Sequence, residues 1–422
     1  MNFMQLPEIP RLTLENVTVA ACLLDMPGDL VTTDLTIEGG RIAAGPGTPV
    51  DMRRAMVFPA FIDVHTHLDK GHIQPRCPNP DGTFRGARTA TTADRAQRWN
   101  ARDVGRRMDF SLRSAWAHGT RAIRTHLDST ASQYRVSFGV FRELQAKWAG
   151  RIELQAVNLC GIDQVADRRA FDEIADEVAA SGGVLGAVVR PNRELRSWLR
   201  FFFAAAARRG LAADLHVDES GDASVATLRE VAQTVLATGF DAPVMVGHCC
   251  SLAVQPESEA LATLDLVARA GLHVVSLPMC NLYLQDRVPG RTPRWRGITL
   301  VHEMKARGIR VAFASDNTRD PFHAYGDLDM LEVMREATRI GHLDHSDADW
   351  IHSFLANPAA AAGFAAPSLA VGAPADLVIC SARNWSELFA RPQADRILMR
   401  DGRTIQRRLP AYAELDDLME SA

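Results

Sequence analysis

The sequence lacks the features that would suit a nucleic acid or a membrane. Its 47 Lys and Arg residues are balanced by 51 Asp and Glu residues, and the net charge of −4 gives no attraction for polyanions or anionic lipids. No apolar run approaches the roughly 18–20 residues that span a bilayer. The first fourteen residues contain Glu8 and prolines where a signal peptide needs an apolar segment. We therefore expect a cytoplasmic protein with neither of these partners.

Cysteine pairs of the kind that hold zinc or form redox centres are also missing. The seven cysteines are odd in number and show no Cys-x-x-Cys spacing, which favours reduced thiols. There is no internal repeat and no low-complexity segment. Of the 422 residues, 47% are hydrophobic and 23% are charged, which is typical of a globular protein with an ample core.

Both ends of the chain show the patterns of short β-strands. Residues 11–56 alternate β-branched and polar side chains, and Gly39-Gly40 is a typical hairpin turn. Residues 372–380 and 396–405 repeat this pattern, with Asp401-Gly402 as a turn. The sequence predicts one small composite β-sandwich domain, built from residues 1–56 and from residues 366–422 with the C-terminal tail.

The middle of the chain alternates strands with helices, which is the pattern of a parallel α/β fold. Eight strands are expected, beginning near residues 57, 120, 152, 184, 213, 244, 273 and 310. Eight such units predict a (β/α)8 TIM-like barrel over residues 57–365. The polar segment 74–100 is too long for an ordinary connection and is a candidate active-site lid.

The stretch from Val57 to Asp69 organises this barrel. An apolar run leads to His65 and His67, and residues at i and i+2 of a strand point to the same side. Two imidazoles on one strand face are costly in an apolar core unless each ring nitrogen finds a partner. The spacing therefore favours a metal site.

Three other strand ends carry polar residues, and a barrel of this kind places its chemistry at those ends. His216 and Glu219 follow the fifth strand, His248 ends the sixth, and Asp316-Asn317 follows the eighth. Imidazoles with a carboxylate suit Zn²⁺ or Fe²⁺ and leave a position for water. His126 is a competing candidate for the second shell of the metal or for substrate contact. We interpret Cys249 and Cys250 as small buried residues, because vicinal pairs suit a single ion poorly.

These residues resemble the amidohydrolase superfamily and, within it, the cytosine deaminase branch. The resemblance covers nearly the whole chain and rests on segments 65–69 (His-Thr-His-Leu-Asp), 124–128 (Arg-Thr-His-Leu-Asp), 216–219 (His-Val-Asp-Glu), 274–285, 296–299, 315–322 and 327–331, together with His248. It implies a single divalent metal, Zn²⁺ or Fe²⁺, held by His65, His67, His216 and Asp316.

The resemblance also implies the roles of the catalytic groups. Glu219 is the expected proton shuttle, and His248 is expected to polarise the water or the substrate. Asp316 is expected to accept the proton of the water as well as to bind the metal. The implied activity is hydrolytic deamination of a cyclic amidine, which releases ammonia from a C–N bond other than a peptide bond.

The expected specificity residues depart from the cytosine deaminase pattern. Where that branch has a glutamine that binds the pyrimidine edge, this chain offers Cys160 or Gly161. Asn317 replaces a second aspartate, Phe322 stands where a tryptophan packs on the ring, and Arg190 follows the fourth strand. We expect Asn317, Phe322, Arg190 and Cys160 to contact the substrate. Cytosine, 5-methylcytosine, isocytosine and related small amino-heterocycles of nucleobase metabolism remain open as substrates.

Two alternatives stand beside this hypothesis. One is a hydrolase of a cyclic amide or of an N-substituted amino-heterocycle, of the creatinine or triazine type, and the other is a non-catalytic barrel. Because every ligand and shuttle position holds a competent residue, the catalytic hypotheses are favoured. The expected partners are a small heterocyclic substrate and water. Assembly into a homo-oligomer stays open.

Overall fold

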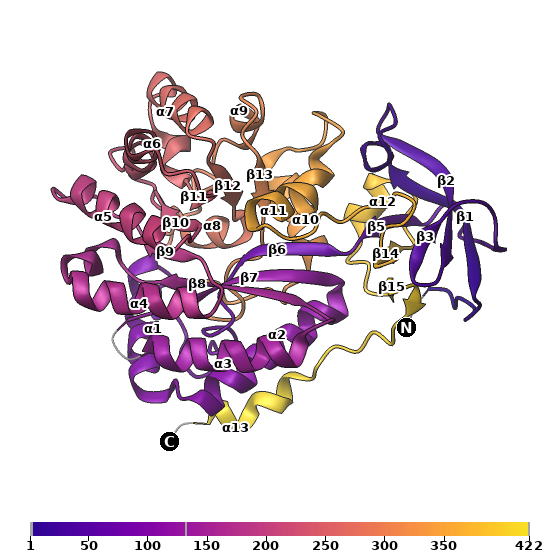
Figure 1. Ribbon diagram of the computed structural model, residues 1–422, viewed down its shortest axis with the longest axis horizontal. Coiled ribbons are helices and arrows are strands. Elements are labelled where there is room, and N and C mark those ends of the chain that lie inside the picture. Colours follow the sequence, from indigo (N-terminus) through magenta and orange to yellow (C-terminus); the bar gives the residue numbers. More distant parts are fainter. Residues whose placement is uncertain (1–2, 131–132, 421–422) are drawn as a thin grey trace.

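The middle of the chain forms a barrel of parallel strands surrounded by helices, as the sequence predicts (Figure 1). The structure is a computed structural model that describes residues 3–130 and 133–420. Within these residues the barrel strands are β6 (Phe61–Thr66), β7 (Thr120–Asp128), β8 (Glu153–Leu159), β9 (Leu185–Val188), β10 (Ala213–Val217), β11 (Val244–His248), β12 (His273–Ser276) and β13 (Val311–Phe313).

Isolated parallel bridges join the two barrel sheets at both of their edges and close the barrel. The sheet β6-β7-β8 and the sheet β13-β12-β11-β10-β9 are each hydrogen-bonded in order. A parallel bridge between Val157 and Val184 joins β8 to the start of β9, and one between Thr66 and Asp316 joins β6 to the residues after β13. The last strand therefore lies beside the first.

The helices of the structure follow the strands in alternation. Those of the barrel region are α1 (Phe84–Arg98), α2 (Ala101–His118), α3 (Gln133–Trp148), α4 (Arg168–Ala180), α5 (Leu195–Arg208), α6 (Thr227–Thr238), α7 (Glu257–Arg269), α8 (Pro278–Leu284), α9 (Val301–Lys305), α10 (Met330–Gly341) and α11 (Ala356–Ala362). The predicted helix over residues 101–118 is α2. It begins where the Asn100 side chain accepts a hydrogen bond from Asp103 N and ends at Gly119, whose φ of 104° favours glycine.

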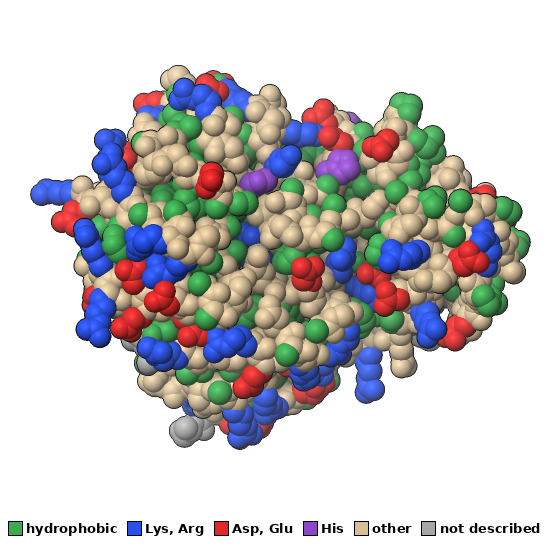
Figure 2. All heavy atoms as spheres, in the orientation of Figure 1, with side chains coloured by type: hydrophobic (Ala, Val, Ile, Leu, Met, Phe, Trp, Pro, Cys, Tyr) green, Lys and Arg blue, Asp and Glu red, His purple; other side chains and the backbone are tan. Residues whose placement is uncertain are grey.

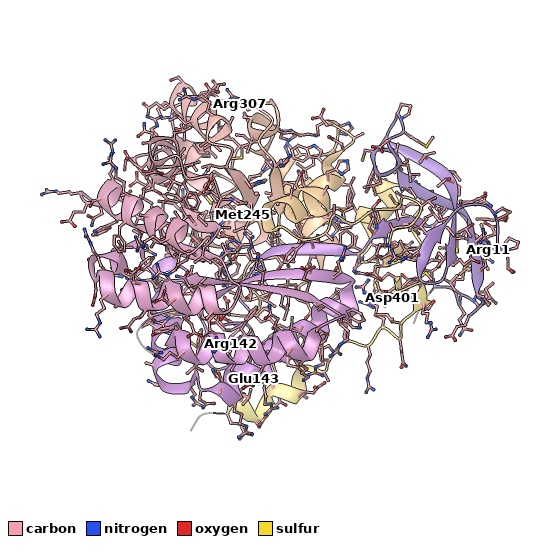
Figure 3. The ribbon with its side chains drawn as sticks, viewed as in Figure 1. Arg11, Arg142, Glu143, Met245, Arg307 and Asp401 are labelled. Atoms are coloured by element: carbon pink, nitrogen blue, oxygen red, sulfur yellow. The ribbon has the colours of Figure 1, made fainter. Side chains whose placement is uncertain are left out.

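The alternation of side chains along β7 shows how the barrel is filled. Ile123 and Leu127 pack outward in the large core between strands and helices. Ala122 belongs to the smaller core inside the barrel. Arg124, on the same face as Ala122, donates to Asp214 Oδ2 over 2.9 Å. Figure 3 shows Met245 inside the barrel, whereas Arg142 and Glu143 lie on its outer layer.

Strands from both ends of the chain form one hydrogen-bonded sheet, where the sequence led us to expect a sandwich. In the described residues its strands are β1 (Arg11–Ala20), β2 (Leu30–Glu38), β3 (Arg41–Ala43), β4 (Thr48–Asp51), β5 (Met56–Pro59), β14 (Leu377–Cys380), β15 (Ile397–Arg400) and β16 (Arg403–Thr404). The predicted turns at Gly39-Gly40 and Asp401-Gly402 lie between β2 and β3 and between β15 and β16.

The apolar run that starts at Val57 is divided between the two sheets. β5 pairs with β14, and after Ala60 the chain enters the barrel as β6. The sequence does not reveal this division because both halves are equally apolar and fully buried. The boundary predicted at residue 57 thus falls inside β5, and the division into domains stays a prediction.

Arg396 connects the β sheet to the barrel. Its guanidinium donates to both carboxylate oxygens of Asp329, over 2.7 and 2.6 Å. Asp329 is also the N-cap of α10 and lies 3.2 Å from His118 Nδ1. The carboxylate raises the pKa of His118, although burial opposes this shift. A buried bidentate pair of this kind fixes both the relative orientation of the two side chains and the distance between them.

The C-terminal tail returns from the β sheet to the barrel (Figure 1). Tyr412 stacks on Phe110 of α2, with ring centroids 5.7 Å apart. The tail ends in α13 (Asp416–Met419), where Leu418 O accepts a hydrogen bond from Arg76 over 3.0 Å. The tail therefore packs against the segment that precedes α1.

Charges of both signs are interspersed over the face drawn in Figure 2, in keeping with the small net charge. Among the described residues, no helix combines the length and the apolar character that a membrane crossing requires.

We expect Arg396→Met to lower the free energy of unfolding by about 3–5 kcal/mol, because it leaves the buried Asp329 carboxylate without its main partner. Urea unfolding followed by circular dichroism measures this loss. Arg383→Met is the matched control, because Arg383 pairs with Glu387 at the surface and such pairs contribute about 0–1 kcal/mol. Equal stability of the two variants would contradict the connecting role of Arg396.

Candidate active site

Closure of the barrel brings His65, His67, His216 and Asp316 together. His65 Nε2 lies 3.1 Å from His216 Nε2, and His216 Nε2 lies 3.5 Å from His67 Nε2. Asp316 Oδ1 lies 3.1 Å from His67 Nε2 and 3.6 Å from His65 Nε2. The side chains that the sequence placed at three separate strand ends thus direct their polar atoms at one point.

This cluster fits a divalent cation better than it fits a network of hydrogen bonds. Nδ1 of each of the three histidines and both carboxylate oxygens of Asp316 are buried without a hydrogen-bond partner among the described residues. Burial lowers the pKa of His65, His67 and His216 well below the usual value, so their rings are neutral, as metal ligands must be. Burial raises the pKa of Asp316 to about 7, a shift that a bound cation would reverse.

His126 lies against the same cluster. Its ring centroid is 4.1 Å from that of His65, and its nitrogens lie close enough to His65, His67 and His216 to share an ion. Asp214 Oδ1 lies 3.3 Å from His126 Nε2, on the side of the Arg124 pair. The structure therefore places His126 beside the predicted ligands, where its ring packs against theirs inside the barrel.

Gly247 makes room for the ring of His65. A Cβ atom at position 247 would lie 3.1 Å from His65 Cε1, which is closer than normal packing allows. A glycine before His248 thus lets the imidazoles from the two strands approach each other.

Glu219 reaches the site through a turn at Asp218. Asp218 has a φ of 52°, and its carboxylate accepts hydrogen bonds from Thr227 N and Leu228 N at the start of α6. Gly221, two residues after Glu219, does not adopt a left-handed conformation, so the buried hydrogen bonds of Asp218 hold this turn.

His248 stands between Glu219 and Asn281. Its Nδ1 is 3.6 Å from Glu219 Oε1 and accepts a hydrogen bond of 3.0 Å from the Asn281 amide. Burial lowers the pKa of His248 to about 3, so the ring is neutral and carries its proton on Nε2. That Nε2 is buried without a partner in the described chain and is free to donate to a molecule in the site.

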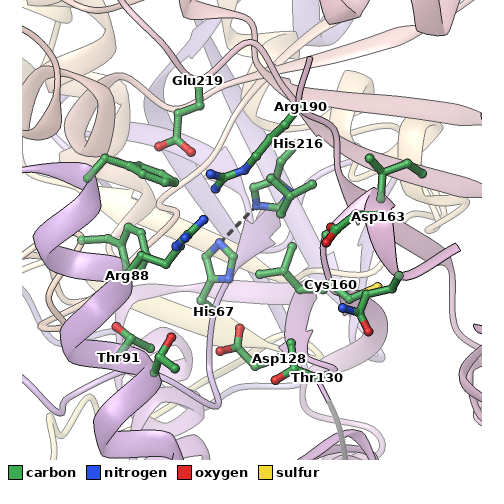
Figure 4. Close-up of a pocket in the computed structure, with 18 of the residues that line it drawn as sticks. His67, Arg88, Thr91, Asp128, Thr130, Cys160, Asp163, Arg190, His216 and Glu219 are labelled. Carbon is green, nitrogen blue, oxygen red and sulfur yellow. Dashed lines mark hydrogen bonds between the residues drawn. The ribbon is translucent and has the colours of Figure 1, made fainter. Parts of the chain in front are cut away.

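A pocket of about 600 Å³ opens above the cluster. His67, His216, His248 and Glu219 line it, and so do all four residues predicted to contact substrate: Cys160, Arg190, Asn317 and Phe322. Figure 4 shows the guanidinium groups of Arg88 and Arg190 between Glu219 and His67. The Asn317 amide already donates to Asp320 Oδ2 over 2.7 Å, so it faces the pocket as a fixed group.

Comparison with known proteins gives the family. Residues 153–405 match the model of an amidohydrolase family. A pterin deaminase from Rhizobium rhizogenes is 50% identical over 99% of each chain. The chain belongs to the amidohydrolase family.

Other relatives of this amidohydrolase are more distant. The N-isopropylammelide isopropyl amidohydrolase of Pseudomonas sp. is 24% identical over 88% of this chain and 93% of its own. The crystal structure of 5-methylcytosine deaminase from Klebsiella pneumoniae superposes with a TM-score of 0.78 at 23% identity, over 94% of this chain and 97% of its own. That likeness confirms the predicted barrel fold.

Sequence reasoning missed several residues of the pocket of this amidohydrolase. Phe84, Arg88, Thr91 and Arg95 reach it from α1, inside the segment that we expected to be a lid. A helical pattern within residues 74–100 was the available signal. Lys70, which lies three residues after His67, also lines the pocket.

We expect the amidohydrolase to carry about one divalent metal ion per chain, and His216→Ala to lose it, because the cluster offers one point of convergence. Elemental analysis after growth with added zinc or iron measures the content. His126→Asn is the matched comparison and should retain the metal. Two ions per wild-type chain, or a full complement in His216→Ala, would contradict a single site that includes His216.

Proposed function

We propose that this amidohydrolase is a metal-dependent hydrolytic deaminase of a pterin-like, two-ring amino-heterocycle. In the reaction, the oxygen of water adds to the ring carbon that bears the amino group, the C–N bond breaks, and ammonia leaves. The observation that carries the proposal is the convergence of His65, His67, His216 and Asp316 beneath Glu219 and His248 on the floor of one pocket.

We assign the metal to His65, His67, His216 and Asp316, with Zn²⁺ or Fe²⁺ as the ions that suit this ligand set. A divalent ion held there would make water acidic enough to lose a proton near neutral pH. The two unpartnered carboxylate oxygens of Asp316 support this assignment, because they are buried beside three converging Nε2 atoms and such oxygens are otherwise costly.

Glu219 is the proposed proton shuttle. Burial raises the pKa of its carboxyl group well above the ordinary value, with the nearby Asp316 adding to the shift. A protonated carboxyl group can donate to the departing nitrogen, and it can regain that proton from the attacking water. His248 is proposed to orient the water or substrate, because its unpartnered Nε2–H faces the site.

The proposed substrate class rests on the relatives and on the pocket. The pterin deaminase shares half of its residues with this chain over nearly the full length, whereas the 5-methylcytosine deaminase shares 23%. The pocket is wide enough for two fused rings. We propose that Phe322 packs on the ring face, that Asn317 and Arg190 contact its polar edge, and that Cys160 takes the place of the glutamine that reads a pyrimidine.

Hydrolysis of an N-substituted amino-heterocycle is the second candidate. The likeness to the N-isopropylammelide amidohydrolase favours it, because such a reaction needs the same water activation and the same proton transfer. The two candidates differ in the amine that leaves.

We expect the purified, metal-loaded protein to release ammonia from pterin at a kcat/KM at least about tenfold above that for cytosine, 5-methylcytosine or isocytosine, since one lost ring contact is worth about that much. Assays of ammonia and of isopropylamine across these compounds and N-isopropylammelide measure the ranking. A higher kcat/KM with a one-ring base would contradict a two-ring substrate and would favour a substrate of the cytosine class. Release of isopropylamine alone would favour the second candidate.

We expect Glu219→Gln to keep its metal and to turn over at least about 10³-fold more slowly, because the amide keeps the shape of the side chain but cannot shuttle a proton. Steady-state kinetics and metal content on the folded variant test this. Glu194→Gln is the control, since Glu194 is an exposed residue just before α5. A near-normal kcat in Glu219→Gln would end the shuttle assignment.

A further inference from the structure

A buried lysine faces the same pocket as the metal cluster. Lys70 follows His67 by three residues and exposes only 5% of its surface. It lines the pocket together with His67, Glu219 and Phe322, and its Nζ lies 4.8 Å from the centre of the Phe322 ring. A lysine in such a position is unusual, because an ammonium group loses much of its hydration on burial.

The ammonium group has more donors than partners. Within residues 3–130 and 133–420, the acid at ion-pair distance from Nζ is Asp128, whose Oδ1 lies 3.4 Å away. An ammonium group can donate three hydrogen bonds. At least one donor is therefore available to a molecule that occupies the pocket.

The surroundings of Lys70 are held firmly. Asp128 Oδ2 accepts a hydrogen bond of 2.6 Å from Arg95 of α1, and Asp128 N donates to Asp69 Oδ2 over 2.8 Å. Asp320 is fixed by Asn317 and by Phe322 N. Asp128, Asp320 and Asp69 together raise the pKa of Lys70 against the effect of burial, so the lysine stays charged.

We infer that Lys70 Nζ binds the oxo oxygen of the substrate ring and that Asp128, held by Arg95, positions it. This inference rests on the proposed function and deepens it, because it makes an oxo group beside the amidine a requirement of the substrate. When water adds to the amino-bearing carbon, electron density moves into the ring and onto that oxygen. A fixed ammonium group stabilises this charge. Lys70 keeps its proton throughout, and the protons of water and ammonia pass through Glu219.

The contact explains how the pocket can do without the glutamine that is absent at position 160. A charged donor at the end of the first strand replaces a neutral amide at the end of the third. A substrate lacking the oxygen would leave at least one N–H of the buried ammonium group without an acceptor, which is a strong basis for discrimination against that substrate.

A double-mutant cycle tests the inference with two probes, pterin and 2-aminopteridine, which lacks the oxo group. In the wild type, removal of the oxygen should lower kcat/KM about 10²-fold, and Lys70→Met should lower kcat/KM for pterin by a similar factor. In Lys70→Met, the two probes should then react at nearly equal rates, because the lost contact is the same. Lys70→Arg should recover part of the preference, since it restores a charged donor.

Further measurements separate this contact from a structural role. Metal content and melting temperature are measured on each variant, and Lys147→Met, an exposed lysine on α3, is the matched control. Asp128→Asn should reduce the preference for the oxo compound without removing the metal. If removal of the oxo group lowers kcat/KM by the same factor in Lys70→Met as in the wild type, Lys70 does not bind the oxygen. The same conclusion follows if Lys70→Arg reacts with pterin at the wild-type rate but shows no preference for pterin over 2-aminopteridine. If the wild type releases no ammonia from either probe, the proposed function fails and the inference fails with it.

Discussion

One backbone hydrogen bond, from Asp316 N to His65 O over 2.8 Å, fixes the geometry on which the site depends. It joins the end of the last barrel strand to the first. Asp63 strengthens the same junction between the first and last barrel strands, which we call the seam, because its carboxylate accepts hydrogen bonds from Ser315 Oγ and Ser315 N. A slip of one residue along this seam would turn the Asp316 side chain away from His67. The seam therefore sets the spacing of groups that lie some 250 positions apart in the chain.

Unfavourable backbone conformations occur at three points where catalytic groups leave their strands. Asp218, His248 and Asp316 have φ values of 52°, 71° and 63°, in the left-handed region that non-glycine residues avoid. Each such residue typically costs about 1–3 kcal/mol and persists only where its surroundings hold it. Here buried hydrogen bonds from α6 hold Asp218, and the hydrogen bond to His65 O holds Asp316. The surrounding core thus stabilises turns that direct Glu219 and the ligand atoms inward.

The sequence predicts the elements of this site better than its details. Strand periodicity and polar strand ends predicted the barrel and placed His65, His67, His216, His248 and Asp316 at one end of it. The choice of His65, His67, His216 and Asp316 as metal ligands came from the resemblance to amidohydrolases. The turn at Asp218 could not be predicted, because it depends on contacts with α6 nine residues later. Lys70 was missed for a similar reason. Its role depends on Asp128, which is distant in sequence and adjacent only in the folded chain.

The pairing of β5 with β14 has a consequence for biosynthesis. Residues 56–59 find hydrogen-bond partners at residues 377–380, so β5 lacks this neighbouring strand until more than three hundred further residues have been synthesised. During that time the apolar edge of β5 is open to other chains. The β sheet can therefore be completed only near the end of synthesis, when β14 to β16 are added to the strands from the N-terminal end of the chain.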